Sequence, residues 1–264
     1  MKTVELETWE NFKDEVKKLN QFLSAQKKIE SNYVAKPLFR GQSNASWVLQ
    51  TSIERYLGHE ITVTKYNNYL LRIKPAVESF TGRTWNVVAD FDISETNFST
   101  VPNYEFMLYA RHHGFPSPLL DWSQSPYVAL FFAFQNSVPE QPVSIFAYVD
   151  DIGHGKGGVV GAPQISALGP YVSSHRRHFM QQSQYTVATE MVNKNWKYCS
   201  HEKYFANTTD EDQDLLIKFT LPGTLKNTYL KKLQQMNINA FTLYGTDESL
   251  MNSLAFREII ERGL

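Results

Sequence analysis

The sequence predicts a single α+β domain in which a mixed β core is flanked by helices. Segments with the periodicity of amphipathic helices alternate irregularly with short runs rich in β-branched and aromatic residues. Neither an internal repeat nor a linker divides the 264 residues, a length that one domain can occupy. We expect an N-terminal helix over 1–30, a core over 36–187 and a C-terminal strand with helices over 215–264.

Helices are predicted where apolar spacing and capping residues agree. They cover about 8–30, 65–80, 103–114, 125–135 and 222–236, and we expect Asp247 to cap a last helix. Thr8 and Asn103 suit N-cap positions, because their side-chain oxygens can accept hydrogen bonds from the free N–H groups of a first turn. Pro126 suits the first position of its helix, where a backbone N–H would have no partner.

Strands are predicted at short apolar runs that contain β-branched or aromatic residues. They cover 33–41, 117–124, 142–150, 184–191 and 214–221, with another at 239–245. The stretch "GHGKGG" fits a GxGxxG pattern through Gly153, Gly155 and Gly158. Because a dinucleotide-binding turn needs a helix directly after it and none is predicted, we expect a loop there.

The composition argues against several classes of protein. A formal net charge of −1 gives no global field for nucleic acid or membranes, so such a partner would need a local patch. Cys199 is the only cysteine, which excludes a disulfide within the chain and favours a reducing compartment. No signal-peptide pattern, membrane span or zinc motif is evident, so we expect a cytoplasmic protein without a metal.

Three polar features need an explanation. Arg40 follows the apolar run "PLF", and a buried guanidinium without a partner would be costly. Asp121 and Ser123 stand just before a helix, either as part of its N-terminal cap or as the wall of a pocket. His112 lies near a helix C-terminus, where a histidine is often only a favourable cap.

Two of these stretches resemble a known family. "LFRGQSNASWVLQTSI" and "YEFMLYARHHGFPSPLLDWSQSPYVALFFAF" are similar to the FRG domain, named for its aromatic–Arg–Gly motif. The second stretch departs from the family's usual pattern at Arg111, Ser117 and Pro118, where Gln, Thr and Arg are usual. A third, weaker block, "RHFMQQSQYT", has Ser183 in place of glycine.

The same motifs are similar to the arginine–serine–glutamate class of ADP-ribosyltransferases. That similarity implies an ADP-ribosyltransferase-like fold with NAD as co-substrate. The residues it implies for binding NAD are Arg40, Gly41, Gln42, Trp122 and Ser123. Arg40 would contact the pyrophosphate bidentately, Gly41 would allow close approach of the ligand, and Trp122 or a nearby tyrosine would stack on nicotinamide.

The catalytic carboxylate is the open question of this resemblance. The class carries a glutamate on its third motif, where this chain has Gln181, Gln182 and Gln184. The carboxylate could come from Asp121, Glu190 or Glu105, and His112 could act as a base toward the acceptor. The expected catalytic residues are Arg40, Asp121, Ser123, His112 and Gln181.

Cations and rings near the third block suggest an acceptor. Arg176, Arg177, Lys194 and Trp196 suit single-stranded RNA or DNA, although a solvated basic loop is an equal alternative. We therefore expect an NAD-dependent ADP-ribosyltransferase that modifies a macromolecule, RNA being slightly favoured. It would act as a toxin or phage-defence effector held by an inhibitory antitoxin. The alternatives are an NAD glycohydrolase and a non-catalytic binding module.

Overall fold

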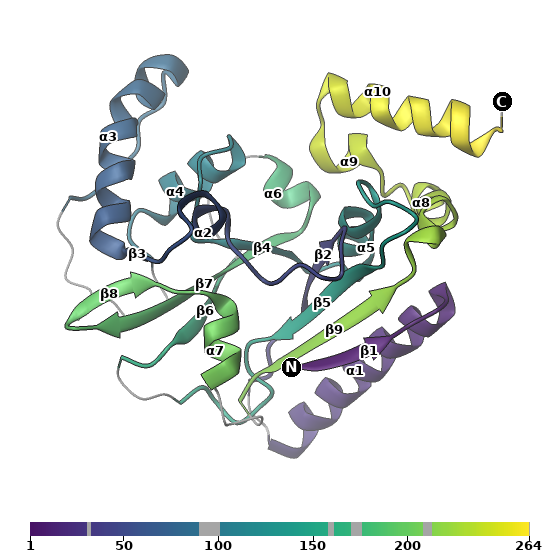
Figure 1. The fold of residues 1–264 in the computed structure, drawn as a ribbon, viewed down its shortest axis with the longest axis horizontal. Helices are drawn as coiled ribbons and strands as arrows, with labels where there is room; N and C mark the ends of the chain where they lie inside the picture. Colours follow the sequence, from purple (N-terminus) through teal and green to yellow (C-terminus); the bar gives the residue numbers. More distant parts are fainter. Residues whose placement is uncertain (31–32, 90–100, 158–160, 170–175, 208–212, 264) are drawn as a thin grey trace.

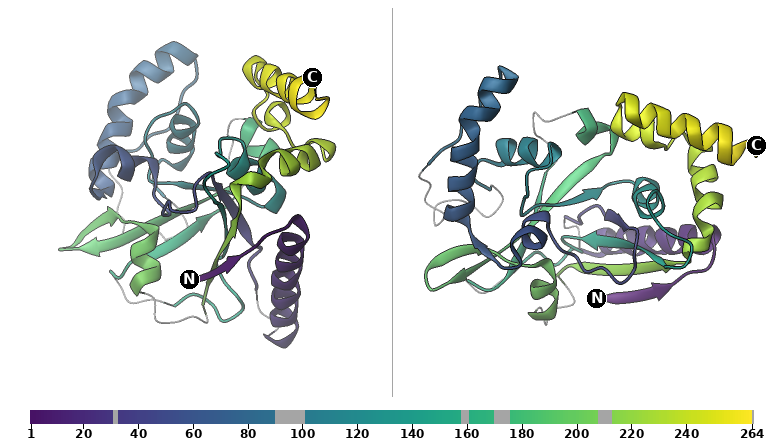
Figure 2. Two further views of the ribbon diagram at one scale, coloured as in Figure 1. Left: turned by 45° about the vertical axis from the view of Figure 1, so that its right-hand side comes forward. Right: turned by 45° about the horizontal axis from the view of Figure 1, so that its top comes forward.

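The computed structural model describes residues 1–30, 33–89, 101–157, 161–169, 176–207 and 213–263. Helices and one mixed sheet confirm the predicted α+β class. Figure 1 shows the sheet running across the molecule, with α1 along its lower edge. In all three views of Figures 1 and 2, α3 and α10 stand apart on either side of the central elements.

The sheet is antiparallel apart from one pair of strands. Its order is β1 (Lys2–Glu5), β9 (Leu215–Leu221), β5 (Val143–Val149), β2 (Leu38–Gln42), β4 (Leu120–Ser123), β7 (Ser183–Val192), β8 (Asn195–Tyr198) and β3 (Ile61–Thr62), with β6 (Gln164–Leu168) paired to β7. Only the β1–β9 pair is parallel among the described strands. β2 therefore lies in the middle of the sheet.

The helices predicted from periodicity are present. They are α1 (Trp9–Glu30), α3 (Val63–Thr81), α4 (Tyr104–His112), α5 (Pro126–Phe134), α8 (Lys226–Gln235) and α10 (Asp247–Ala255). Thr8 caps α1, its hydroxyl accepting from the backbone N–H of Asn11 at 3.1 Å. Asn103 does not cap α4 with its side chain, because that side chain donates to Asn67 and to the carbonyl of Val88.

Other elements were not predicted. The strands among them are β1, β3, β6 and β8. The helices are α2 (Ser52–Leu57), α6 (Arg176–Met180) and α7 (His201–Asn207), together with a 3-10 turn at Gly223–Leu225 and a π-helical turn at Phe256–Glu261. The strand predicted at 239–245 is wrong, because α9 (Ala240–Tyr244) occupies it. Asn239 and Thr242 form a reciprocal capping box that begins this helix. The cap predicted at Asp247 is wrong by one residue, because Thr246 caps α10 and Asp247 is its first helical residue.

The loop predicted in place of a dinucleotide-binding turn is present. Gly153 and Gly155 lie in irregular structure, and Gly158 lies outside the described residues. The next described element is the strand β6, which contributes no helix N-terminus to a pyrophosphate. Within the described part of the chain, no helix is long and apolar enough to cross a membrane.

The apolar core has three parts that the sheet connects. Phe12, Phe134 and Phe219 belong to the part formed by α1, α5, β5 and β9. A second part lies between α3, α4 and β7, and a third is centred on Trp122 and Tyr148. Aromatic rings fill much of each part, which accounts for the high aromatic content of the chain.

Helix α5 packs directly on β2 at Gly41. A Cβ atom on Gly41 would lie 1.9 Å from the carbonyl oxygen of Ala129 and 2.6 Å from the backbone nitrogen of Ala133. No real side chain tolerates such contacts, so glycine is required for this helix to reach the strand. The side of Gly41 on which a Cβ would stand is therefore filled by α5, and the residue also lines the cleft described below.

We expect Gly41→Ala to lower the free energy of unfolding by about 3 kcal/mol, because the added methyl group overpacks the β2–α5 contact. Urea denaturation followed by circular dichroism measures the change. Gly157→Ala is the matched control, since a Cβ there would meet its nearest neighbour, the side chain of Gln213, at an ordinary 3.7 Å. Equal stability of the two variants would show that the contact does not constrain residue 41.

Candidate functional site

A cleft of about 440 Å³ lies between β2 and β4. These neighbouring strands pair through one residue each, Phe39 with Ser123, whereas β2 pairs with β5 over the whole length 38–42. The cleft residues that carry the argument below are Arg40, Arg111, His112, Asp121, Arg177, Gln181 and Tyr244. They come from β2, α4, β4, α6, the turn after α6, and α9.

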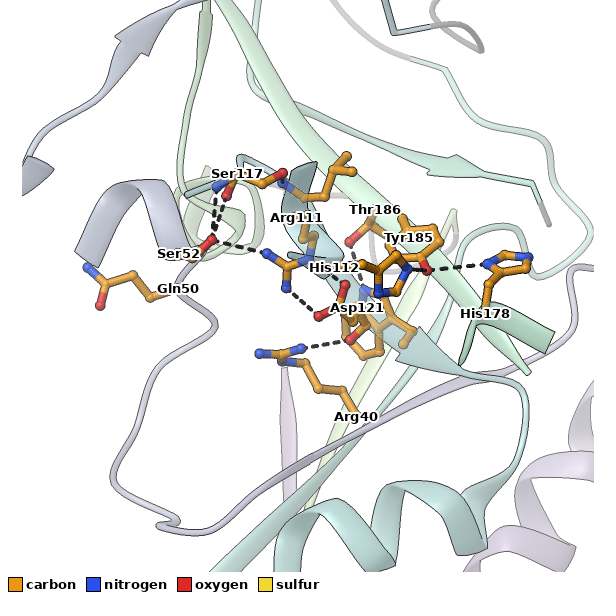
Figure 3. Close-up of polar contacts among 12 residues, drawn as sticks. Arg40, Gln50, Ser52, Arg111, His112, Ser117, Asp121, His178, Tyr185 and Thr186 are labelled. Atoms are coloured by element: carbon orange, nitrogen blue, oxygen red, sulfur yellow. Dashed lines mark hydrogen bonds and ion pairs between the residues drawn. The ribbon is translucent and has the colours of Figure 1, made fainter. Parts of the chain in front are cut away.

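Arg40 reaches from β2 toward β4 across this gap. Its Nη1 donates to the main-chain oxygen of Asp121 at 2.7 Å (Figure 3). Its Nε is buried and has no hydrogen-bond partner among the described residues, and no carboxylate in that part of the chain pairs with it. Burial lowers the pKa of Arg40 to about 10, which still leaves the guanidinium charged at neutral pH.

The carboxylate of Asp121 is bound by a different arginine. Nε of Arg111 donates to Oδ1 of Asp121 at 2.5 Å, and Nη2 of Arg111 donates to Oδ2. Nη1 of Arg111 donates to the hydroxyl of Ser52 at 3.1 Å, so α4, β4 and α2 meet at one guanidinium. The side chain of Arg111 is 12% exposed, whereas that of Asp121 is 44% exposed.

This pair determines the charge of Asp121. Burial on its own would raise the pKa of that carboxyl, but the Arg111 charge and its hydrogen bonds outweigh burial and hold the pKa below its usual value. Arg40 and His112 lower the same pKa further. Asp121 is therefore ionised at neutral pH and is partly open to solvent.

His112 lines the cleft, and its ring is hydrogen-bonded to the buried Tyr185. Its Nε2 lies 3.0 Å from the hydroxyl of Tyr185, and the same hydroxyl lies 3.2 Å from Nδ1 of the buried His178 (Figure 3). Burial raises the pKa of Tyr185 well above its usual value, so this phenol stays neutral. A neutral hydroxyl can donate to one imidazole and accept from the other, which orients the His112 ring.

Ser123 and Gln181 make structural hydrogen bonds. The Ser123 hydroxyl donates to the main-chain oxygen of Gln181 at 2.7 Å and accepts from the backbone N–H of Ser125 at 3.0 Å. Nε2 of Gln181 donates to the main-chain oxygen of Leu243 at 3.0 Å. Since the single hydroxyl proton of Ser123 is already donated, its expected catalytic role does not fit, and it joins β4 to the turn before β7.

Trp122 does not face the cleft with its ring. Strand β4 alternates, so the indole points to the opposite side from Asp121 and Ser123. There it packs on Tyr148 at 5.7 Å between ring centroids and donates from Nε1 to Thr186 at 2.7 Å. The expected stacking of nicotinamide on Trp122 is therefore excluded by its burial.

The alternative carboxylates lie elsewhere. Glu190 is buried near the far end of β7, where it pairs with Lys203 at 2.5 Å, and Glu105 is exposed on α4 outside the cleft. Asp121 is thus the acidic residue among the described residues that line the cleft.

The four residues predicted to bind an acceptor do not form one surface. Arg177 lines the cleft with its guanidinium 5.6 Å from the ring centroid of Tyr244, and Arg176 is exposed on the same short helix. Trp196 is buried on β8, and Lys194 stands at the β7–β8 turn. The ten-residue β7 separates these two groups by roughly 30 Å. Figure 1 shows α6 and the β7–β8 turn at opposite ends of that strand.

Sequence reasoning missed Arg111 and Ser52. The one signal for Arg111 was its departure from the glutamine usual at that position, and nothing singled out Ser52. No group of three or more His, Cys, Asp or Glu residues that could hold a metal lies in the described ranges.

Comparison with known families identifies one part of the chain. Residues 35–141 match the sequence profile of the FRG domain. The chain contains an FRG domain. The matched range holds Arg40, Arg111, His112 and Asp121, whereas Arg177 and Tyr244 lie outside the FRG domain. No curated protein and no solved structure matches the chain.

We expect the Arg111–Asp121 pair to be worth about 2 kcal/mol of unfolding free energy, less than a fully buried pair because solvent screens Asp121. Asp121→Ala should cost more than Arg111→Met, since it leaves the less exposed charge unpaired, and the double variant should cost less than the sum. Urea denaturation of the four proteins gives the coupling. Glu10→Ala, in the exposed Lys232–Glu10 pair, should change nothing measurable. Additive single effects would contradict a coupled pair.

The same pair predicts a dependence of stability on pH. Because the folded-state pKa of Asp121 lies below its unfolded value, its contribution is complete above about pH 4 and is lost as the pH falls further. The difference in unfolding free energy between the wild type and Asp121→Asn should therefore be constant near neutrality and shrink in acid. A difference that grows in acid would reverse the sign of the shift.

Proposed function

We propose that the cleft of this FRG domain binds NAD through its pyrophosphate, and that the protein transfers ADP-ribose from NAD to a macromolecule. The observation that carries the proposal is the state of Arg40. Its charged guanidinium lines the cleft with a carbonyl as its hydrogen-bond partner, and no carboxylate among the described residues pairs with it. Phosphate oxygens match the planar fork of a guanidinium and would complete its hydrogen bonding.

The charge of the cleft supports an anionic ligand. Arg40, Arg111 and Arg177 line it with Asp121 as the acidic residue, so positive charge exceeds negative charge. A cleft with low-dielectric walls concentrates such a field on its ligand. Its volume falls within the range of small-molecule sites.

The chemistry of transfer can be assigned to residues of this cleft. The bond between ribose C1′ and the nicotinamide nitrogen breaks, nicotinamide keeps the electron pair, and the sugar becomes oxocarbenium-like. The ionised Asp121 would stabilise that positive charge. The acceptor then forms a bond to C1′ and its proton passes to His112, which lines the same cleft.

A binding module without catalysis is the second candidate, and a specific observation favours it. Both carboxylate oxygens of Asp121 already accept hydrogen bonds from Arg111. In addition, the third motif has glutamine at the position where a transferase of this class has glutamate. An NAD glycohydrolase would use the same cleft with water as acceptor. The two enzymatic alternatives differ only in what attacks C1′.

We expect Arg40→Ala to reduce NAD consumption by roughly 100-fold, the scale seen when one positioned donor is removed from a site that stabilises charge. Arg40→Lys should recover only part, because an ammonium is a point charge without the bidentate fork. The assay is NAD labelled on the adenylate phosphate, incubated with RNA, DNA and protein fractions, with nicotinamide release followed in parallel. Arg257→Ala, on the exposed C-terminal turn, is the control.

The outcomes separate the candidates. Label on one class of macromolecule supports the transferase and names its acceptor, whereas nicotinamide release without label indicates a glycohydrolase. Binding of NAD without either product indicates a binding module. Full activity of Arg40→Ala would remove the pyrophosphate role of Arg40.

A toxin or phage-defence role belongs to the same proposal, because unrestrained modification of the cell's own macromolecules would be harmful and would require an inhibitory partner. Expression of the wild type would then slow growth while Arg40→Ala would not.

A further inference from the structure

A second pocket, of about 620 Å³, adjoins the cleft at Arg40. Arg40, Gly41 and Ser43 line both spaces, so one guanidinium stands at their junction. The remaining lining comes from the last residue of β2, from the segment that follows it and from α2. These residues are Gln42, Ser46, Trp47, Val48, Gln50 and Arg55.

The lining combines an accessible ring with positive charge. Trp47 is 55% exposed, a large value for an indole that borders a pocket. The charged residues of the lining are both arginines, Arg40 and Arg55, and the polar ones are neutral serines and glutamines. An indole face suits stacking with a flat ring, and the neutral amide of Gln50 suits hydrogen bonding to its edge.

The segment that carries Trp47 is anchored on both sides. Ala45 donates its backbone N–H to Pro142 at 2.7 Å and accepts from Nζ of Lys218 at 2.6 Å. Gln42 donates from Nε2 to the main-chain oxygen of Val48 at 3.1 Å, just after the tryptophan. Hydrogen bonds therefore fix the segment that carries Trp47, and this residue is exposed while it lines the pocket.

Arg55 strengthens the case for an anion at the junction. Its guanidinium is tied to the same segment, with Nη1 donating to the main-chain oxygen of Gln50 at 2.7 Å. The pKa of Arg40 is lowered mainly by burial and in addition by the like charges of Arg111 and Arg55. A phosphate at Arg40 would relieve this repulsion from both sides.

We infer that this pocket holds the nucleoside at the far end of the ligand, with its base stacked on Trp47 and its phosphates between Arg40 and Arg55. This inference deepens the proposed function and rests on it for the direction of the ligand. Nicotinamide would lie beside Asp121 in the cleft, so the end in the Trp47 pocket is adenosine. The ligand class is an adenine nucleotide with at least one phosphate.

Trp47→Ala tests the assignment. Binding of NAD, ADP-ribose, AMP and nicotinamide mononucleotide is measured by isothermal titration calorimetry on the full chain. We expect Trp47→Ala to weaken NAD, ADP-ribose and AMP by roughly tenfold, the scale of one base–aromatic stack, and to leave nicotinamide mononucleotide unchanged. Trp47→Phe keeps a ring and should retain most of the affinity. Phe80→Ala, with a 92% exposed ring on α3, is the matched control.

The outcomes distinguish this inference from the proposed function. If NAD binds in an Arg40-dependent way with the same affinity in Trp47→Ala, the pocket assignment is overturned and the proposed function stands. If AMP binding depends on Trp47 but NAD is neither bound nor cleaved, the pocket stands and the proposed function falls. Weakening of nicotinamide mononucleotide in place of AMP would overturn the assigned direction.

Discussion

The bidentate pair between Arg111 and Asp121 is the interaction on which the cleft depends. It joins the end of α4 to β4 and keeps the aspartate ionised beside an open space. It also uses the carboxylate that would otherwise neutralise Arg40, whose link to β4 is a main-chain oxygen. One ion pair thus leaves a second cation available to a ligand, which explains how a central strand can carry a guanidinium.

Several residues expected to bind NAD or to act in catalysis support the structure of the cleft. Ser123 joins the end of β4 to the turn before β7, Trp122 fills the core on the reverse side of β4, and Gly41 allows α5 to pack on β2. Tyr185 orients His112 from a fully buried position. Strand alternation and close packing explain these structural roles. A sequence motif alone does not show which face of a strand is buried or what packs on it.

Long periodic helices such as α1 and α3 could be predicted, because consecutive residues along the sequence define both the amphipathic face and the cap. The helix at Ala240–Tyr244 could not, since three of its five residues are aromatic or β-branched and resemble a strand until the Asn239–Thr242 capping box is considered. Arg40 and Asp121 were recognised from local pattern. The contact between Arg111 and Ser52 could not be predicted, because it depends on how distant segments meet in the fold. The same holds for the separation of Lys194 and Trp196 from the cleft.

Helix α9, near the end of the chain, has a consequence beyond its own position. Tyr244 lines the cleft together with residues of the FRG domain, and the main-chain oxygen of Leu243 accepts the hydrogen bond from Gln181. The lining of the cleft is therefore divided between residues inside the FRG match and residues outside it. A change in the sequence around α9 would therefore alter the cleft without altering the residues that match the FRG domain.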